Sequence, residues 1–417
     1  RRAAELLALA RTHGAWTRSE LGELAQREAY ALSCAGRLAQ AADVYEQAAE
    51  HVDGDARVEV LRLRLEQLLR GGRLHDGLAL SERVLAAVGV KLATGPGGIA
   101  RHLGQRLGLR MRGLDFTPRD LATIPAPELR RVDVLYSVSS GLAFADPIQG
   151  RVAQNEFLRR ALEVGEPFRV CLALGQEVAF RATTGTTADR DVEVVASRLK
   201  ELARQVGHPH VLGITDASLG MAAFLAGRWG EARSYFEAGL RTFRDHGTGV
   251  RWETDLAEAY WLGAMVQLGE LREVARVTPL LLRDAVERGD AFSQLILRSW
   301  RSNQAWLVLG RPDDAQEHAE AAVDPAQPAP ALHFYYGLIA RTQVDLYRRR
   351  GPDAWRRIDD AWPRLRREHV LRVQLIRVEA TALRARAALA AAVGASGRGR
   401  AELLKITRGL ADELIGE

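Results

Sequence analysis

The chain has 417 residues, of which 47% are hydrophobic and 27% are charged. This length and apolar content suit two or three domains, or one extended repeat array with a substantial core. A formal net charge of +5 is a weak field for so long a chain and does not indicate a nucleic-acid-binding protein. Two cysteines exclude a disulfide framework or a zinc cluster, and no apolar run is long enough to cross a membrane.

Residues 1–90 predict closely spaced helix pairs. Strong helix formers dominate, and apolar residues recur at spacings of three and four. Gly36 and Gly72 mark turns between helices, and the stretch CAGRLAQAADVYEQAAE places Ala41 and Tyr45 behind the first of them. The chain starts at Arg1 without a methionine or an apolar leader. We therefore expect a cytoplasmic fragment of a longer protein.

Residues 91–131 interrupt the helical pattern. KLATGPGG is a turn, and Pro118, Pro125 and Pro127 punctuate the rest. We expect an irregular connector with one short basic helix at about 98–112, and the pattern leaves open whether this connector is a hinge or a packed insertion. The main repeat block is predicted at 132–417. Within it, Asp324–Leu332 predicts a loop, with Pro330 near the start of the next helix.

Glycines in the main block keep a regular spacing. Five of them are 42, 42, 41 and 41 residues apart, and two more extend the series outwards: Gly185, Gly227, Gly269, Gly310, Gly351, then Gly141 and Gly394. Around Gly227, the small residues Gly220 and Ala232 allow two helices to approach closely, and Trp229 and Phe236 fill the space between units. The pattern predicts an all-α fold, a right-handed α-solenoid of helix pairs with a period of 41–42 residues.

Several stretches carry a family resemblance. They include GRLAQAADVYEQAAEH, LRGGRLHDGLALSERVLAAVGV, RHLGQRLGLRMRG, GVRWETDLAEAYWLGAMVQLGEL and ARTQVDLYRRRGPDAWRRIDDAWPRLRREHVLRVQLIRVEA, in this order. Single units resemble tetratricopeptide repeats, whose usual period is shorter, about 34 residues. The chain as a whole resembles the C-terminal repeat region of bacterial signalling proteins that join a Ser/Thr protein kinase to a STAND-type P-loop ATPase. Arms of this type also occur on regulators similar to the maltose-regulon activator.

The resemblance implies a sensor or scaffold arm without catalysis of its own. The sequence contains no P-loop, kinase or GxSxG signature, so we predict neither enzyme activity nor a cofactor. His208-Pro209-His210 has no third ligand nearby in the sequence, and we expect a loop there rather than a metal site. The predicted partners are a protein or peptide, the parent chain's own kinase and ATPase domains, or a small ligand. No nucleic-acid or membrane partner is expected.

A tetratricopeptide register places certain side chains on a concave groove. Counting back from the turn glycines gives these candidate ligand- or partner-binding residues: Met221, Phe224, Trp300, Gln304, Arg341, Asp345 and Arg348. Trp300, Gln304 and Arg341 would form one amphipathic patch. The alternative is that Trp300 is a core residue between helices, and both interpretations remain open.

The tract from Tyr347 to His369 supports a second hypothesis, in which the chain is the nucleic-acid- or anion-binding arm of a transcription regulator and uses residues 348–367. Arginines alternate with Trp355 and Trp362, an arrangement that can stack on bases or clamp phosphates. The candidate anion-binding residues are Arg349, Arg350, Arg356, Arg357, Arg364, Arg366 and Arg367. The tryptophan spacing of seven also fits the core face of a helix, with the arginines in solvent. Salt dependence distinguishes this function from binding of a partner in the groove. Binding driven by phosphate groups weakens steeply with ionic strength, whereas peptide binding in an aromatic groove need not.

Overall fold

The computed structural model describes residues 2–92, 104–109, 111–185, 189–322 and 329–417. All regular structure in these ranges is helical, so the predicted all-α class is confirmed. None of the helices in these ranges is both long and apolar enough to span a bilayer.

The first block contains five helices. They are α1 (Arg2–His13), α2 (Arg18–Cys34), α3 (Leu38–Glu50), α4 (Gly54–Arg70) and α5 (Leu74–Ala87). A capping box starts α2, in which Thr17 accepts from the backbone N–H of Glu20 and the Glu20 side chain accepts from that of Thr17. Of the two cysteines, Cys171 is buried and Cys34, at the end of α2, is exposed.

The connector leads into six longer helices. They are α7 (Ala126–Ala145), α8 (Pro147–Val164), α9 (Pro167–Ala182), α10 (Asp189–Val206), α11 (Pro209–Leu225) and α12 (Trp229–His246). Proline occupies an N-terminal position of four of them, where its missing N–H costs no hydrogen bond. At α11, His208 is the N-cap and its side chain accepts from the N–H of His210. The predicted loop is therefore shorter than expected, because Pro209 and His210 belong to the first turn of α11.

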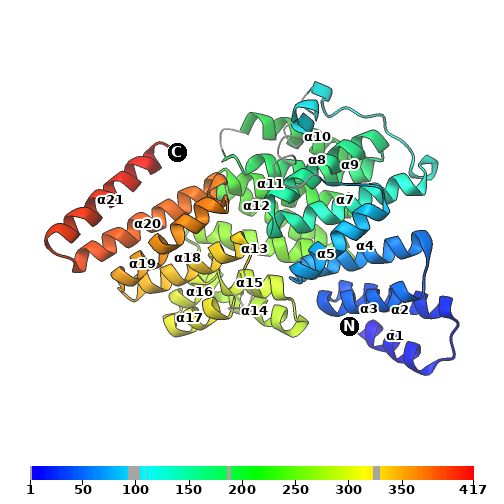
Figure 1. The fold of residues 1–417 in the computed structure, drawn as a ribbon, viewed down its shortest axis with the longest axis horizontal. Helices are drawn as coiled ribbons and strands as arrows, with labels where there is room; N and C mark the ends of the chain where they lie inside the picture. Colours follow the sequence, from blue (N-terminus) through cyan, green and yellow to red (C-terminus); the bar gives the residue numbers. More distant parts are fainter. Residues whose placement is uncertain (1, 93–103, 110, 186–188, 323–328) are drawn as a thin grey trace.

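The remaining helices complete the array (Figure 1). They are α13 (Arg251–Gln267), α14 (Leu271–Arg288), α15 (Ala291–Arg298), α16 (Gln304–Val308), α17 (Pro312–Ala321), α18 (Ala331–Tyr347), α19 (Gly351–Arg367), α20 (Gln374–Gly394) and α21 (Gly397–Ile415). Short 3-10 turns lie at Leu121–Thr123 and Val370–Arg372. Pro330 caps α18 as predicted, whereas part of the predicted 324–332 loop lies outside the described residues.

One turn geometry recurs between helices. A residue with positive φ follows the first helix, and the next residue donates its N–H to a carbonyl five positions back, over 2.8–2.9 Å. This bond satisfies a carbonyl at the end of the helix. The positive-φ residues in these turns are Gly36, Gly72, Gly227, Gly269, Gly310 and Arg349. The sequence therefore repeats a helix–turn–helix unit with a shared turn.

Three predicted turn glycines are corrected. Gly141 lies inside α7, Gly351 is the first residue of α19, and Gly394 is the last residue of α20. Close helix packing requires glycine at both Gly141 and Gly351. An added Cβ would lie 2.4 Å from the Leu69 side chain at Gly141 and 2.4 Å from the Ala390 carbonyl oxygen at Gly351. The spacing suggested turns there, but glycine serves close helix contact as readily as a turn.

Successive helices pack side by side, and many also contact the helix two positions further on. α7 contacts α9, α9 contacts α11, and α11 contacts α13. Small residues permit this packing as expected: an added Cβ at Gly220 would lie 2.9 Å from the ring of Phe236 on α12. Phe236 is buried, and its ring stacks at 6.3 Å from Tyr260 on α13. The core is therefore shared between the pair α11–α12 and the following helix α13.

The described parts of the predicted connector pack on the core, and the helix that follows them begins earlier than expected. α7 starts at residue 126 rather than 132, and α4 and α5 contact α7 directly, so the connector does not separate two blocks. Residues 104–109 are helical, while 98–103 and 110 of the predicted basic helix lie outside the described residues. Leu109 and Ile124 are buried in the same core cluster as α7–α10. In Figure 1 the described residues of the connector, in cyan, lie along the outside of α8–α10.

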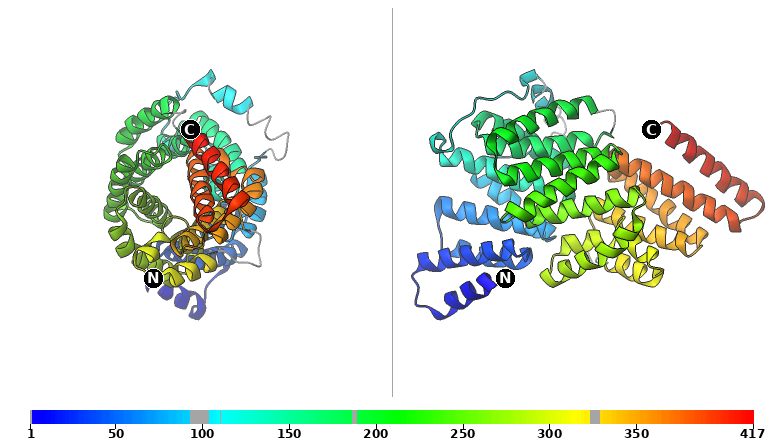
Figure 2. Two further views of the ribbon diagram at one scale, coloured as in Figure 1. Left: turned by 90° about the vertical axis from the view of Figure 1, so that its left-hand side faces the viewer. Right: turned by 180° about the vertical axis from the view of Figure 1, so that it is seen from behind.

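Contacts between distant parts of the chain close the array. Arg37, after α2, donates to the carbonyl of Glu287 in α14 over 3.3 Å. The N–H of Gln374, at the start of α20, donates to the carbonyl of Thr183, after α9, over 3.2 Å. Viewed end-on, the helices surround a common centre (Figure 2, left). The N-terminal helices are thereby placed against α13–α15.

Candidate functional site

The most apolar groove candidates are buried, which corrects the prediction that they line an open surface. Phe224 is 0% and Trp300 is 4% exposed. Trp300 contacts the rings of Tyr260 and Tyr336, with centroids 5.3 and 4.9 Å away. Aromatic side chains of this size gain more from a closed core than from a groove edge. The alternative interpretation of Trp300 as a core residue is the one that the structure supports.

The expected register also fails at this point because the helix is broken. Ser299–Asn303 separates α15 from α16, and Trp300 has a φ of 47°. Trp300 and Gln304 therefore do not share one helix face. The adjacent Arg301 is only 1% exposed, lies 4.3 Å from the Trp300 ring, and pairs with Glu379 over 2.8 Å. Sequence reasoning missed this buried arginine, whose only signal was the polar run SWRSN.

Three of the remaining groove candidates lie on or directly after α18 and form hydrogen bonds within the protein. Asp345 is 6% exposed and accepts from Arg357 Nε over 2.7 Å, so it too is buried rather than groove-lining. Arg348 bonds Asp313 and Gln316 of α17. Arg341 donates to the carbonyl of Gly337 over 3.1 Å. Met221 and Gln304 are half-buried, and the structure does not bring all seven candidates to one surface.

Three of the seven candidate arginines of the tract pair with carboxylates. Arg357 pairs with Asp345, Arg356 with Asp353 over 3.6 Å, and Arg364 with Glu368 over 2.8 Å. Arg364 also lies 3.9 Å above the ring of Phe334. The other four candidates of the tract are exposed: Arg349, Arg350, Arg366 and Arg367.

A recess lies beside this tract, where α19 meets α20 and α21. Its volume is about 420 Å³, and Trp355, Asp359 and Asp360 contribute aromatic and acidic lining. Arg384 of α20 lies 4.6 Å from the ring of Trp362 and bonds Asp359. Leu403 of α21 forms part of the wall. The recess offers an open surface that combines an aromatic ring with a carboxylate, which suits a side chain of a partner.

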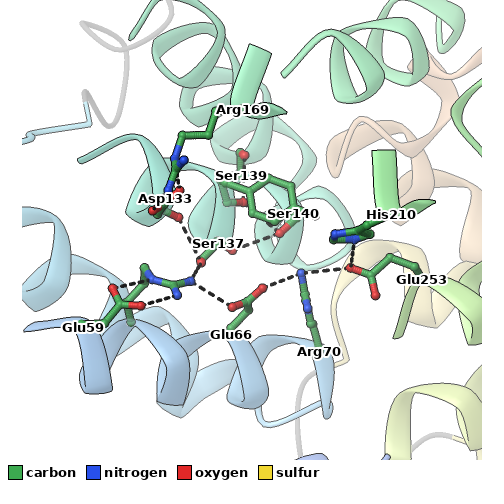
Figure 3. Close-up of polar contacts among 12 residues, drawn as sticks. Glu59, Glu66, Arg70, Asp133, Ser137, Ser139, Ser140, Arg169, His210 and Glu253 are labelled. Carbon is green, nitrogen blue, oxygen red and sulfur yellow. Dashed lines mark hydrogen bonds and ion pairs between the residues drawn. The ribbon is translucent and has the colours of Figure 1, made fainter. Parts of the chain in front are cut away.

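A second assembly of polar side chains is buried between α4, α7, α9 and α13 (Figure 3). Arg62 of α4 donates to Glu59, to Glu66 over 3.1 Å and to Ser137 of α7 over 2.9 Å. One turn earlier on the same face of α7, Asp133 accepts two 2.7 Å bonds from Arg169 of α9. We call these residues, with Arg70, Glu253 and His210, the buried polar network.

Arg70 extends the buried polar network to α13 and α11. It pairs with Glu66 over 2.6 Å and with Glu253 over 3.5 Å, while His210 Nε2 lies 3.8 Å from Glu253. The Arg70 guanidinium also stacks 4.8 Å from the ring of Trp252. Burial alone would raise the pKa of Glu253, but Arg70 and His210 outweigh burial and lower it. Glu253 is therefore a buried carboxylate held in its charged form by its partners.

The buried polar network joins helices that are far apart in the sequence. Each of its cations contacts at least one carboxylate. The sequence signal was the spacing of Arg62, Glu66 and Arg70 by four residues, which places them on one helix face. Such a face is usually solvated, so the sequence did not predict its burial.

A third cluster of charged side chains lies where α13 and α14 meet the turn at Gly36, between α2 and α3. Asp255 accepts from Arg288 and Arg251, and Arg288 also pairs with Asp290 over 3.1 Å. Burial raises the pKa of Asp255 to about 6 and that of Glu258 to about 7. Nearby Arg251 opposes both shifts without cancelling them, because four carboxylates share two guanidinium groups here.

Neither a metal-binding cluster in the described residues nor a match to a known family was found. The described residues contain no group of three or more His, Cys, Asp or Glu side chains placed to hold a metal ion. No protein family model matches the chain, and no curated protein matches it.

Proposed function

We propose that this chain is a non-catalytic sensor or scaffold arm, built as a solenoid of tetratricopeptide-like helix pairs with a period of about 41–42 residues. It binds a protein, peptide or small ligand and regulates an attached kinase or ATPase module. The observation that carries the proposal is the packing of most helices on the next one and of many on the one after that, with a recurring turn. Such arrays present extended surfaces, and their stability is shared among neighbouring units.

The recess beside Trp355 is the surface that we assign to a partner. It is open, it combines aromatic and acidic lining, and it lies on the terminal helices, away from the contacts that close the array. Trp300 is unsuitable for a test because its replacement would disrupt the core. The informative variants are Trp355→Ala and Asp360→Lys, with the exposed Arg276→Ala on α14 as the matched control.

The experiment measures which molecules the chain retains at about 0.05 M and about 0.5 M salt. A discrete protein retained at both, released by both recess variants and kept by Arg276→Ala, supports the sensor arm. Retention of nucleic acid at low salt alone, unaffected by the recess variants, would instead support a regulator arm that uses the exposed arginines Arg349, Arg350, Arg366 and Arg367. The carboxylate pairing of the rest of the tract favours the first outcome.

A further inference from the structure

Three arginines converge where the connector packs on α8 and α9. Arg106 belongs to the helical segment 104–109, Arg151 to α8 and Arg181 to α9. Arg106 donates to Glu177 Oε1 over 2.7 Å, and Arg181 donates to the same oxygen over 2.6 Å. Glu177 is 0% exposed, and its second oxygen, Oε2, is buried without a hydrogen-bond donor. One oxygen of the carboxylate is thus saturated and the other is unsatisfied.

Arg151 has no carboxylate partner of its own in the described ranges. It donates to the carbonyl of Phe180 and to Thr183 Oγ1, the latter over 2.8 Å, at the C-terminal end of α9. The helix dipole supplies roughly half a negative charge there, which balances only part of the guanidinium charge. Burial and then the neighbouring Arg106 lower the pKa of Arg151. A third arginine is therefore held beside two others at an electrostatic cost.

The surrounding carboxylates do not correct this imbalance. Glu156, on the same helix as Arg151, is engaged by Arg159, Arg160 and Gln105. Arg106 and Arg181 thus share the Glu177 carboxylate, and Arg151 lies close enough for its charge to interact with that carboxylate as well. The Arg106 and Arg181 side chains keep 22% and 15% exposure, so these two arginines connect the buried Glu177 carboxylate with the solvent.

We propose that Arg106, Arg151 and Arg181 bind a hydrogen phosphate group, whose P–OH donates to Glu177 Oε2. Guanidinium groups match the oxygens of a phosphate, and charge-assisted hydrogen bonds of this kind are strong. The unsatisfied carboxylate oxygen needs a donor, which a protonated phosphate carries and a sulfate at neutral pH lacks. The site thereby selects between two oxyanions of similar size. It is independent of the recess and of the proposed regulatory role.

The test is calorimetric titration of the full chain with inorganic phosphate, glycerol phosphate and sulfate at constant ionic strength. We expect a saturable phosphate site with a dissociation constant of about 1 mM or below, and sulfate weaker by at least about tenfold. Tighter binding of inorganic phosphate would indicate that the free ion is the ligand, and tighter binding of glycerol phosphate would indicate a phosphomonoester. The thermal midpoint should rise with phosphate by about 2 °C at ten times the dissociation constant.

Variants separate the site from general ionic effects. Arg151→Gln and the less structural Arg106→Gln should each weaken phosphate binding by about tenfold or more, whereas Arg276→Gln on α14 should leave it unchanged. Glu177→Gln offers an amide donor in place of the acceptor and should abolish the preference for phosphate over sulfate. Absence of saturable binding, equal affinity for sulfate in the unmodified chain, or unchanged phosphate binding in a folded Arg106→Gln variant would each overturn the proposal.

Discussion

At the scale of single residues, arginine rather than lysine carries the buried polar contacts. Arg301 is enclosed by Trp300 and Phe224 while it pairs with Glu379. The planar guanidinium can stack on a ring and form directed hydrogen bonds at the same time, which an ammonium group cannot do. The abundant arginines therefore allow charged groups to be buried in pairs with carboxylates. The small net charge of the chain gives no indication of such pairs.

Glu258 should make stability depend on pH. Its pKa is about 7 in the folded chain against 4.5 for an ordinary glutamate, so the folded state holds the extra proton between these values. Stability contributed by this group is present below about pH 4.5 and is lost as pH rises to about 7. Glu258→Gln should therefore raise stability by about 2 kcal/mol at pH 8 and change it little at pH 4.5. Thermal unfolding across this range measures the difference, and a variant no more stable at pH 8 contradicts it.

At the scale of elements, the turn after α18 departs from the others. Arg349 has a φ of 58°, in the left-handed region that glycine occupies in the five equivalent turns. A non-glycine residue there is strained, because its Cβ approaches the backbone. The turn still forms, since Arg350 donates to the carbonyl of Asp345 over 2.9 Å and α19 packs behind it.

Arg349→Gly should relieve this strain. We expect it to stabilise the α18–α19 pair by about 0.5–1 kcal/mol. The reciprocal change Gly227→Ala should destabilise the α11–α12 pair by about 1 kcal/mol through its backbone alone, because an added Cβ there meets nothing closer than 4.0 Å. Hydrogen exchange in the helices that flank each turn measures both effects, and faster exchange around α18–α19 in Arg349→Gly would refute the prediction.

At the scale of the whole molecule, contacts between distant helices hold the array closed. α4 meets α13 through Arg70 and Glu253, and α9 meets α20 through Thr183 and Gln374. Because the first of these contacts is a buried charge pair, removal of one partner leaves the other charge without full compensation. The closed arrangement therefore depends on a few polar side chains as well as on the apolar core.

Glu253→Gln should loosen this closure without unfolding the array. Arg70 would keep Glu66 but lose its link to α13, with a cost of about 1–3 kcal/mol. Hydrogen exchange should accelerate in α4 and α13 and stay unchanged in α19 and α20. The exposed Glu273→Gln on α14 is the control, and equal exchange in both variants would show that Arg70–Glu253 does not hold the helices together.

The sequence by itself determined the all-α class, several turn glycines and the close helix approach at Gly220, because these depend on helix propensity and on contacts between neighbours in the chain. The tertiary structure decided which faces are buried. The register argument placed Trp300 on a groove, but a break in the helix and the rings of Tyr260 and Tyr336 enclose it. Likewise, Arg62, Glu66 and Arg70 form an ordinary polar helix face until α7 and α13 cover it. A local pattern specifies a helix and its apolar side, whereas burial of a polar side depends on partners that are up to about two hundred residues away in the chain and therefore leave no periodic signal.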